Sequence, residues 1–141
     1  MIRYDRQDTD FVFKGRRFNN KWLSKVAGSE GKKIGEIAVV FCSDDYLLNV
    51  NRQFLKHDYY TDIITFDYCE GDLLSGDLLI SVDSVRDNAS HFGTSFDEEL
   101  HRVIVHGLLH LIGYDDHSKE DRKQMREKEN SYLCVRNTMS L

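Results

Sequence analysis

The order of strand-like and helix-like segments predicts an α+β fold, a small mixed β-sheet packed with helices. Strand-like and helix-like segments alternate through the first half of the 141-residue chain, and three helical segments follow one another at its end. The length suits one folded unit, and no repeat, low-complexity tract or linker-like stretch interrupts the sequence. We therefore expect residues 1–141 to form a single domain.

The first half of the chain predicts two strands and two helices. Weak alternation over residues 2–7 is typical of an edge strand, and residues 36–43, "EIAVVFCS", are the strongest β-branched and apolar run. Apolar residues at helical spacing predict a helix within residues 19–31, which ends at one of the glycines at positions 28 and 31. A second helix is expected over residues 44–55, where Ser43 is the N-cap and acidic residues occupy the first turn.

Two more strands and a short helix follow. Residues 61–68, "TDIITFDY", form a second strong strand, and residues 76–82, "GDLLISV", form a third. Residues 70–76, "EGDLLSG", supply the turn residues between these two strands. Residues 84–93 predict a helix that ends at a glycine, Gly93.

The last third of the chain predicts two long helices. Ser95 and Glu98 have the S-x-x-E spacing of a capping box, and they open a periodic apolar segment over residues 97–113. Ser118, with an acidic residue three positions later, starts a charged helix over residues 119–133.

Composition limits the class of protein. The net charge of −5 argues against a generally basic nucleic-acid binder, but residues 1–60 carry a balance of +3 and residues 61–141 one of −8. The first ten residues are charged from the third position, unlike a signal peptide, and no apolar run approaches the roughly 20 residues of a membrane helix. The three cysteines form no C-x-x-C pair, which argues against a disulfide framework or a thiolate zinc site. We expect a cytoplasmic protein that makes no contact with a membrane.

A cluster of histidines in the apolar helix predicts a metal site. His106 and His110 are four residues apart and therefore share one helix face, where two imidazoles can bind one zinc ion. Gly113 lets the helix end in a reversing turn, which brings a later side chain back to the same ion. The third ligand is expected to be Asp116 or His117, and the spacing favours Asp116. The alternative is a pair of core histidines hydrogen-bonded to carbonyl groups.

Three protein ligands leave a fourth position for water, which is typical of catalytic rather than structural zinc. Such an ion activates water and polarises a phosphoryl or carbonyl oxygen, so hydrolysis is the expected reaction class. Proteases with two helical histidines usually have H-E-x-x-H, in which the glutamate is the general base. The chain has Gly107 at that position, which argues against a metalloprotease.

The segment "HGLLHLIGYDD" resembles the signature of the YbeY family of endoribonucleases in ribosomal-RNA maturation. "NRQFLKHDYYTDIITFDY" and "SGDLLIS" are similar to two further segments of that family, in the same order, and the resemblance covers residues 35 to 133 approximately. It implies an α+β fold and one zinc ion held by His106, His110 and the residue at position 116. It also implies a single-strand endoribonuclease that acts in 16S 3′-end maturation and ribosome quality control, with ribosomal RNA precursor, ribosomal proteins or the small subunit as partners.

The chain departs from the family pattern at two positions. Asp116 lies where the family has a third histidine, and Leu55 lies where it usually has an arginine beside the site. An anionic ligand makes bound water less acidic, and leucine cannot stabilise a pentacoordinate phosphate. Arg52, Lys56 or His57 are the expected replacements for phosphate binding.

The predicted mechanism gives each group a role. His106 and His110 hold the ion that activates water or the scissile phosphate, and Asp115 or His117 relays a proton. The strand over residues 61–68 forms one wall of the cleft. The basic residues near position 55 contact the RNA backbone, and three tyrosines are candidates to stack on unpaired bases: Tyr59, Tyr60 and Tyr114.

Two other functions are compatible with the same residues. One is a zinc peptidase or amidase whose general base is Asp115 or Glu99. The other is a binding factor in ribosome biogenesis that is not an enzyme, in which zinc only fixes the turn after Gly113.

Overall fold

The computed structural model describes residues 1–140, and its secondary structure has the predicted order β-α-β-α-β-β-α-α-α. The elements are β1 (Ile2–Gln7), α1 (Arg16–Ser29), β2 (Lys33–Cys42), α2 (Asp44–Phe54), β3 (Ile63–Asp67), β4 (Leu73–Ser81), α3 (Val82–Phe92), α4 (Phe96–Ile112) and α5 (Lys119–Thr138).

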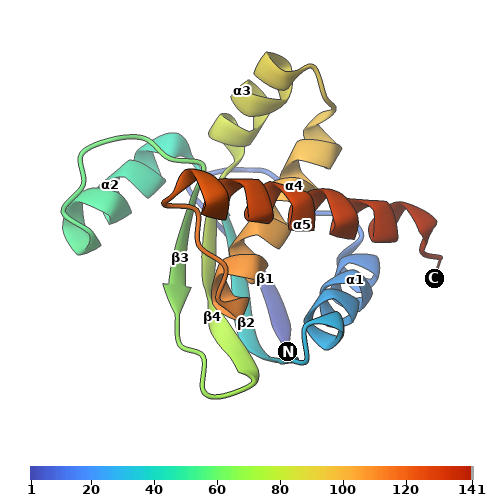
Figure 1. Ribbon diagram of the computed structural model, residues 1–141. Coiled ribbons are helices and arrows are strands. Elements are labelled where there is room, and N and C mark those ends of the chain that lie inside the picture. Colours follow the sequence, from blue (N-terminus) through green and yellow to red (C-terminus); the bar gives the residue numbers. More distant parts are fainter. Residues whose placement is uncertain (141) are drawn as a thin grey trace.

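The four strands form one mixed sheet in the order β1-β2-β4-β3 (Figure 1). Strand β2 pairs in parallel with both β1 and β4, whereas β3 pairs antiparallel with β4. The sequence prediction of an α+β fold with a mixed sheet is confirmed, and β1 is an edge strand as expected. No helix within residues 1–140 is long and apolar enough to cross a membrane.

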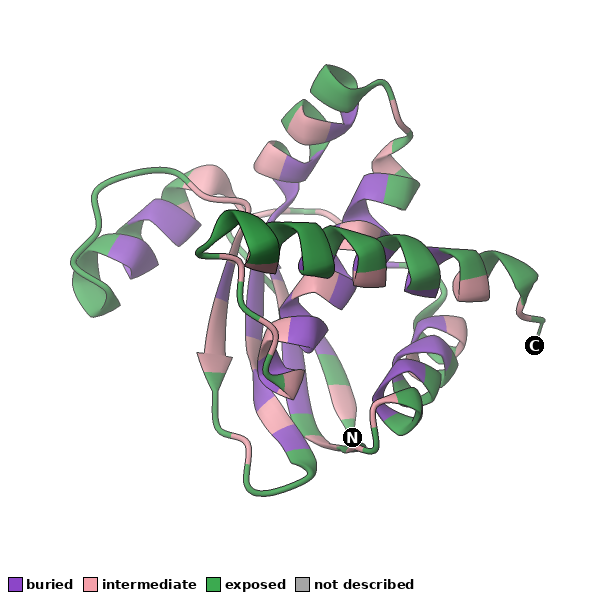
Figure 2. Ribbon diagram, viewed as in Figure 1, coloured by how far each residue is buried: buried purple, intermediate pink, exposed green. Residues whose placement is uncertain are grey.

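Helices cover the two faces of the sheet unequally. Helix α4 packs on β3 and β4, with α5 on its outer side, and α1 packs on β2 beside it (Figure 1). This face holds the main hydrophobic core, whereas α2 covers part of the opposite face over a smaller core that includes Leu47, Ile64 and Leu79. Figure 2 shows that α4 is largely buried and that α5 exposes its outer surface. An apolar helix between a sheet and another helix is held rigidly, which matters because α4 carries both histidines.

Three boundaries differ from the sequence prediction. Helix α1 begins at Arg16 and continues through Gly28, and α5 continues to Thr138. The predicted turn over residues 70–76 was wrong in its second half, because β4 already begins at Leu73. Side chains alternate there, with Leu74 buried and Leu73 exposed, and this is a strand pattern that the flanking glycines concealed.

Serine caps begin four of the helices, and the caps of α4 and α5 differ. Ser118 and Asp121 form the complete box at the start of α5. At α4 the Ser95 hydroxyl accepts from the Glu98 N–H at 3.1 Å, but the Glu98 carboxylate accepts a hydrogen bond from the Thr94 hydroxyl. The prediction for α4 is therefore right for the serine cap, and its reciprocal glutamate bond is replaced by the bond to Thr94.

Gly76 lies where β4 approaches β3 most closely. A Cβ atom at this position would lie 2.2 Å from the Phe66 carbonyl oxygen, a distance that only a backbone shift could relieve. We expect Gly76→Ala to lower the free energy of unfolding by about 2–3 kcal/mol, because overpacking forces a shift of the hairpin. The matched control is Gly28→Ala, where nothing lies within 4 Å of the added methyl group. The control should raise stability by about 0.5–1 kcal/mol. Urea denaturation measures both, and equal effects of the two substitutions would contradict the packing argument.

The first of the three histidines of α4, His101, is a buried residue in the core. Its side chain lies between Phe13 and Trp22, and the Arg136 guanidinium donates to its Nε2 at 3.0 Å. Burial and the charge of Arg136 lower the pKa of His101 to about 4. The imidazole is therefore neutral in the folded protein at pH 7.

This histidine should make the fold sensitive to acid. Between pH 6.5 and 4 the unfolded chain binds a proton at His101 that the folded chain does not, so stability falls as the pH is lowered. The loss should reach about 3 kcal/mol at pH 4, since one pKa unit corresponds to about 1.4 kcal/mol. His101→Gln keeps an acceptor for Arg136 and should remove this part of the pH dependence. Urea denaturation at pH 4.5 and 7 tests it, and an unchanged pH slope in the variant would refute the role of His101.

Candidate metal centre

Helix α4 fixes the positions of the two candidate histidine ligands. Leu108 and Leu109 are fully buried in the main core, so the helix cannot rotate about its axis. Gly107 lies against the sheet, where an added Cβ atom would lie 2.7 Å from Ile63 Cδ1. A side chain at position 107 would therefore have to displace Ile63 and Leu78, and the glycine permits close contact between helix and sheet.

Three side chains converge at the end of α4. His106 Nε2 and His110 Nε2 are 3.0 Å apart, and Asp116 Oδ2 lies 3.3 Å from the first and 3.4 Å from the second. A tetrahedral zinc ion with bonds of about 2.0–2.1 Å would separate its donor atoms by roughly 3.3 Å. The spacing of these three atoms therefore fits a single small cation. Within residues 1–140, the group of side chains that could hold a metal ion is His106, His110 and Asp116.

The turn after α4 brings Asp116 to the histidines. Gly113 has a φ of 126°, and its N–H bonds the carbonyl oxygens of Leu109 and His110. The Tyr114 N–H also bonds the Leu109 carbonyl, and the chain then folds back along the helix. This is the reversal that the sequence predicted, and it brings together two residues of one helix turn and one residue of the loop.

The Glu30 carboxylate, directly after α1, stabilises the position of this loop. Glu30 accepts hydrogen bonds from the hydroxyl groups of Tyr114, at 2.6 Å, and of Tyr132. The Lys128 amine lies 3.1 Å from the same carboxylate. These contacts connect the end of α1, the loop and α5, so the position of Asp116 depends on three separate parts of the chain.

Glu129 on α5 orients the first histidine. Its Oε2 accepts a hydrogen bond from His106 Nδ1 at 2.7 Å, which leaves His106 Nε2 free to face the other two donors. Arg102 donates to the other Glu129 oxygen at 3.0 Å, and Arg126 lies 3.6 Å from it. The sequence reasoning missed this residue. A signal was present, because Glu129 falls on the buried stripe of α5 that also includes Met125 and Tyr132.

The surroundings of His106 and Glu129 favour a positive imidazole and a negative carboxylate. Burial opposes protonation of His106, but its hydrogen bond to Glu129 and the charges of Glu129 and Asp116 outweigh burial and raise the pKa of His106. Burial likewise opposes the charge on Glu129, but its contacts with His106 and Arg102 lower the pKa of the carboxyl group. The pocket around His106 therefore stabilises positive charge, as a cation site requires.

Two further carboxyl groups lie close to the centre. Burial raises the pKa of Asp62, although the positive charge of His106 acts against the shift, and Asn88 donates to its Oδ2 at 3.1 Å. Burial also raises the pKa of Glu99, near Asp62 and Glu129. Asp62 lies directly before β3, in the segment that the sequence predicted as a wall of the cleft.

The other predicted proton-transfer residues lie outside the converged group. Asp115 is exposed in the loop. His117 is also exposed, and its carbonyl oxygen accepts a hydrogen bond from Arg122 at 2.8 Å. The structure thus places Asp116 with the histidines and leaves His117 at the start of α5.

The predicted substrate-binding residues lie in the exposed segment between α2 and β3. Arg52 forms an ion pair with Asp58, and His57 Nδ1 shares a hydrogen bond of 3.0 Å with the Tyr59 hydroxyl. Lys56 has a positive φ of 55° and is exposed. Leu55 is 40% exposed and offers no charge to a phosphate.

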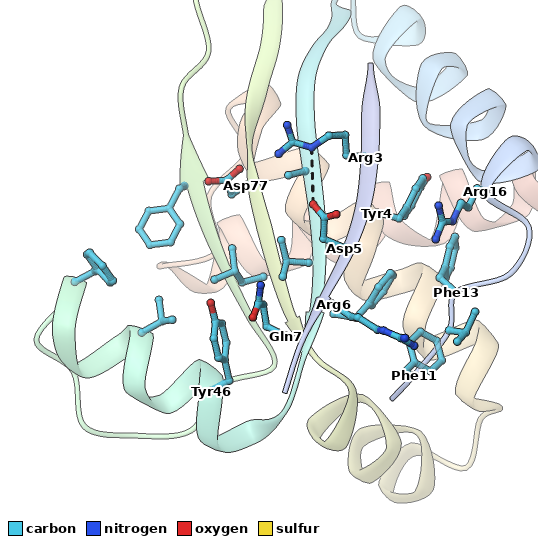
Figure 3. Close-up of a pocket in the computed structure, with 18 of the residues that line it drawn as sticks. Arg3, Tyr4, Asp5, Arg6, Gln7, Phe11, Phe13, Arg16, Tyr46 and Asp77 are labelled. Carbon is cyan, nitrogen blue, oxygen red and sulfur yellow. Dashed lines mark ion pairs between the residues drawn. The ribbon is translucent and has the colours of Figure 1, made fainter. Parts of the chain in front are cut away.

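The structure also has a hollow away from this centre. A hollow of about 890 Å³ opens on the side of the sheet away from α4, between α2 and β1 (Figure 3). Figure 3 shows Arg3 paired with Asp5 on β1, and Asp77 on β4. None of the converged metal donors lines it. Another hollow, of about 440 Å³, is lined by His106 and Asp116.

The chain thus combines an α+β fold with two helical histidines, a loop carboxylate and a buried carboxylate behind them, an arrangement that could hold the metal ion of a hydrolase. Comparison with known proteins agrees with this class. The family model described as Endoribonuclease YbeY matches residues 3–136, and the chain belongs to that family.

Relatives and a solved structure support the assignment. The "Endoribonuclease YbeY" of Bacteroides thetaiotaomicron is 58% identical over 121 residues, which are 86% of this chain and 88% of that protein. The protein of the same name from Phocaeicola vulgatus is 52% identical over 135 residues, 96% of this chain and 98% of that one. A solution structure from Thermotoga maritima has a TM-score of 0.67 and 31% identity, and covers 94% of this chain and 87% of its own.

Removal of the loop carboxylate should separate the two candidates for the third ligand. We expect Asp116→Ala to weaken Zn²⁺ binding by more than about 100-fold, beyond the range for loss of an outer partner. His117→Ala should change the affinity by less than about 3-fold, because its side chain lies outside the converged group. Isothermal titration with Zn²⁺ measures both. Tight binding by Asp116→Ala together with loss in His117→Ala would contradict the geometry.

The buried Glu129 carboxylate should also affect the affinity for Zn²⁺, through its hydrogen bond with His106. Glu129→Gln keeps an acceptor for His106 but removes the negative charge, so we expect zinc affinity to fall by about 10–100-fold. Glu127→Gln on the exposed side of α5 is the matched control and should leave the affinity unchanged. Equal affinities of the two variants would show that Glu129 does not act on the site.

Proposed function

We propose that the protein is a zinc-dependent endoribonuclease that cuts single-stranded RNA in the maturation of the 16S 3′ end and in ribosome quality control. Family membership supports the endoribonuclease class. The observation that carries the metal dependence is the convergence of His106, His110 and Asp116 at donor distances of 3.0–3.4 Å. Its proposed place of action is the cytoplasm, with precursor ribosomal RNA as substrate and ribosomal proteins or the small subunit as partners.

The proposed division of roles follows from the contacts of each residue. A zinc ion supplies Lewis acidity, which polarises a phosphoryl oxygen and makes water a stronger nucleophile at neutral pH. Glu129 keeps the proton of His106 on Nδ1, so that Nε2 stays available as a ligand. Asp116 adds a negative charge, and the exposed groups Asp115 and His117 are the proposed proton carriers beside the site.

RNA contacts are proposed for the exposed segment between α2 and β3. Arg52, Lys56 and His57 would meet the backbone at the rim. Tyr59 and Tyr60, which are 56% and 59% exposed, present rings on which unpaired bases can stack, worth about 1–3 kcal/mol per base.

The two alternative functions have less support. A peptidase would need a general base in place of the glutamate of the H-E-x-x-H proteases. Gly107 occupies that position and packs against Ile63 of the sheet. The buried Glu99 is the candidate within reach of the centre, through its neighbours Asp62 and Glu129. A binding factor without catalysis is favoured by one observation, the uncharged Leu55 beside the predicted phosphate contacts.

Metal removal is the direct test of the proposed activity. Protein stripped with a chelator should lose at least about 100-fold of its rate on single-stranded RNA and regain the rate with one equivalent of Zn²⁺. The double variant His106→Ala, His110→Ala should stay inactive with zinc, and casein should not be cleaved by either protein. RNA cleavage that persists in the double variant would indicate a contaminating nuclease. Metal-bound wild type that cleaves no RNA would favour the binding factor.

A further inference from the structure

Four cations on α5 form one row beside the metal donors. The row contains Lys119, Arg122, Lys123 and Arg126. Lys119 is followed three and four residues later by Arg122 and Lys123, and these are followed four and three residues later by Arg126, so the side chains share one face of the helix. We call this set the α5 basic row. All four residues are exposed. The row is unexpected in a chain with a net charge of −5, and more so because residues 61–141 hold the acidic excess.

The row and the metal donors line one hollow. His106, Asp116 and Glu129 lie along the same cavity of about 440 Å³ as all four cations of the row. A ligand that fills this cavity would contact His106, Asp116 and the row together. Its chemistry must suit a divalent cation and several ammonium and guanidinium groups together, and this combination selects a polyanion with phosphate groups.

The cations of the row are mostly free to bind such a ligand. Among residues 1–140, no carboxylate lies within ion-pair distance of the amines of Lys119 and Lys123. Arg126 lies 3.6 Å from Glu129, too far for a hydrogen bond, so its donors stay available. Arg122 has a different role, because it donates to the His117 carbonyl and holds the loop after Asp116.

The basic residues near Leu55 are less available for phosphate binding. Arg52 is already paired with Asp58, and the His57 ring is stacked on Tyr59 with centroids 5.1 Å apart. Neither residue lines the hollow of the metal donors. A phosphate placed at the donors therefore meets α5 first.

We propose that the α5 basic row is the phosphate-binding subsite of the metal centre. It holds the backbone phosphates of single-stranded RNA on both sides of the scissile bond. This inference rests on the proposed function, and it moves the main phosphate contacts from the segment around Leu55 to α5. Lys119, Lys123 and Arg126 bind phosphate directly, and Arg122 positions the loop that carries Asp116.

The test compares two triple variants with the same change in charge. The first variant removes the three cations that are proposed to bind phosphate directly, and it carries Lys119→Gln, Lys123→Gln and Arg126→Gln. Lys14→Gln, Arg17→Gln, Lys25→Gln removes three exposed cations near and on α1 that form no ion pair among the described residues. Zinc-loaded proteins are titrated with a 12-nucleotide single-stranded DNA, which a ribonuclease does not cut, at several salt concentrations. Zinc content and the KM for an RNA of the same sequence are measured in parallel.

The row variant should bind the oligonucleotide about 10-fold more weakly at 0.1 M salt, compared at equal zinc occupancy because Arg126 also contacts Glu129. Its slope of log affinity against log salt should fall by about 2, because each lost contact to a single strand removes about 0.7. The α1 variant should differ from wild type by less than about 2-fold with the same slope. The KM for RNA should rise with the row variant only.

A milder variant keeps the test valid if the triple variant misfolds or loses zinc. Lys119→Gln, Lys123→Gln leaves the contact between Arg126 and Glu129 intact, and the salt slope should fall by about 1.4. Equal binding by the row variants and the α1 variant would overturn the subsite while wild-type RNA cleavage still supports the proposed function. Conversely, row-dependent binding without any cleavage by zinc-loaded wild type would support the subsite and overturn the nuclease.

Discussion

The buried contact between Glu129 and His106 is the interaction on which the site depends. An imidazole can offer either nitrogen to a metal, and the carboxylate at 2.7 Å from Nδ1 determines that Nε2 faces His110 and Asp116. Arg102 and Arg126 stabilise the charge of this carboxylate inside the protein. Because the contact joins α4 to α5, the orientation of the histidine exists only once the last helix has docked.

The rest of the fold serves to hold α4 and the loop after it. The sheet holds one side of α4 through a glycine contact, and α5 covers the outer side with Glu129 on its buried stripe. Glu30 then connects α1 to the loop through Tyr114 and to α5 through Tyr132. The centre is thus built from α4, the loop after it and α5, and the cations of α5 line the same hollow as His106 and Asp116.

Sequence reasoning succeeded where the determining contacts are local. The order of elements follows from periodicity and caps, and His106, His110 and Asp116 converge within one helix turn and one reversal. It failed where partners are distant in the chain. Glu129 lies 23 residues from His106, and Glu30 lies 84 residues from Tyr114, so only the packed structure brings them together. The early start of β4 was missed for a similar reason, because pairing with β2 and β3 overrides the turn preference of its glycines.

X-ray absorption at the zinc edge of the zinc-loaded protein tests the central claim most directly. The account predicts two imidazole nitrogens at about 2.0–2.1 Å and one or two oxygen ligands at about 2.0–2.2 Å, with no sulfur. We also expect Glu129→Gln to keep the same ligands, with a wider spread of zinc–ligand distances. A spectrum with a sulfur shell near 2.3 Å or with three imidazoles would contradict the assignment of Asp116 and with it the proposed centre.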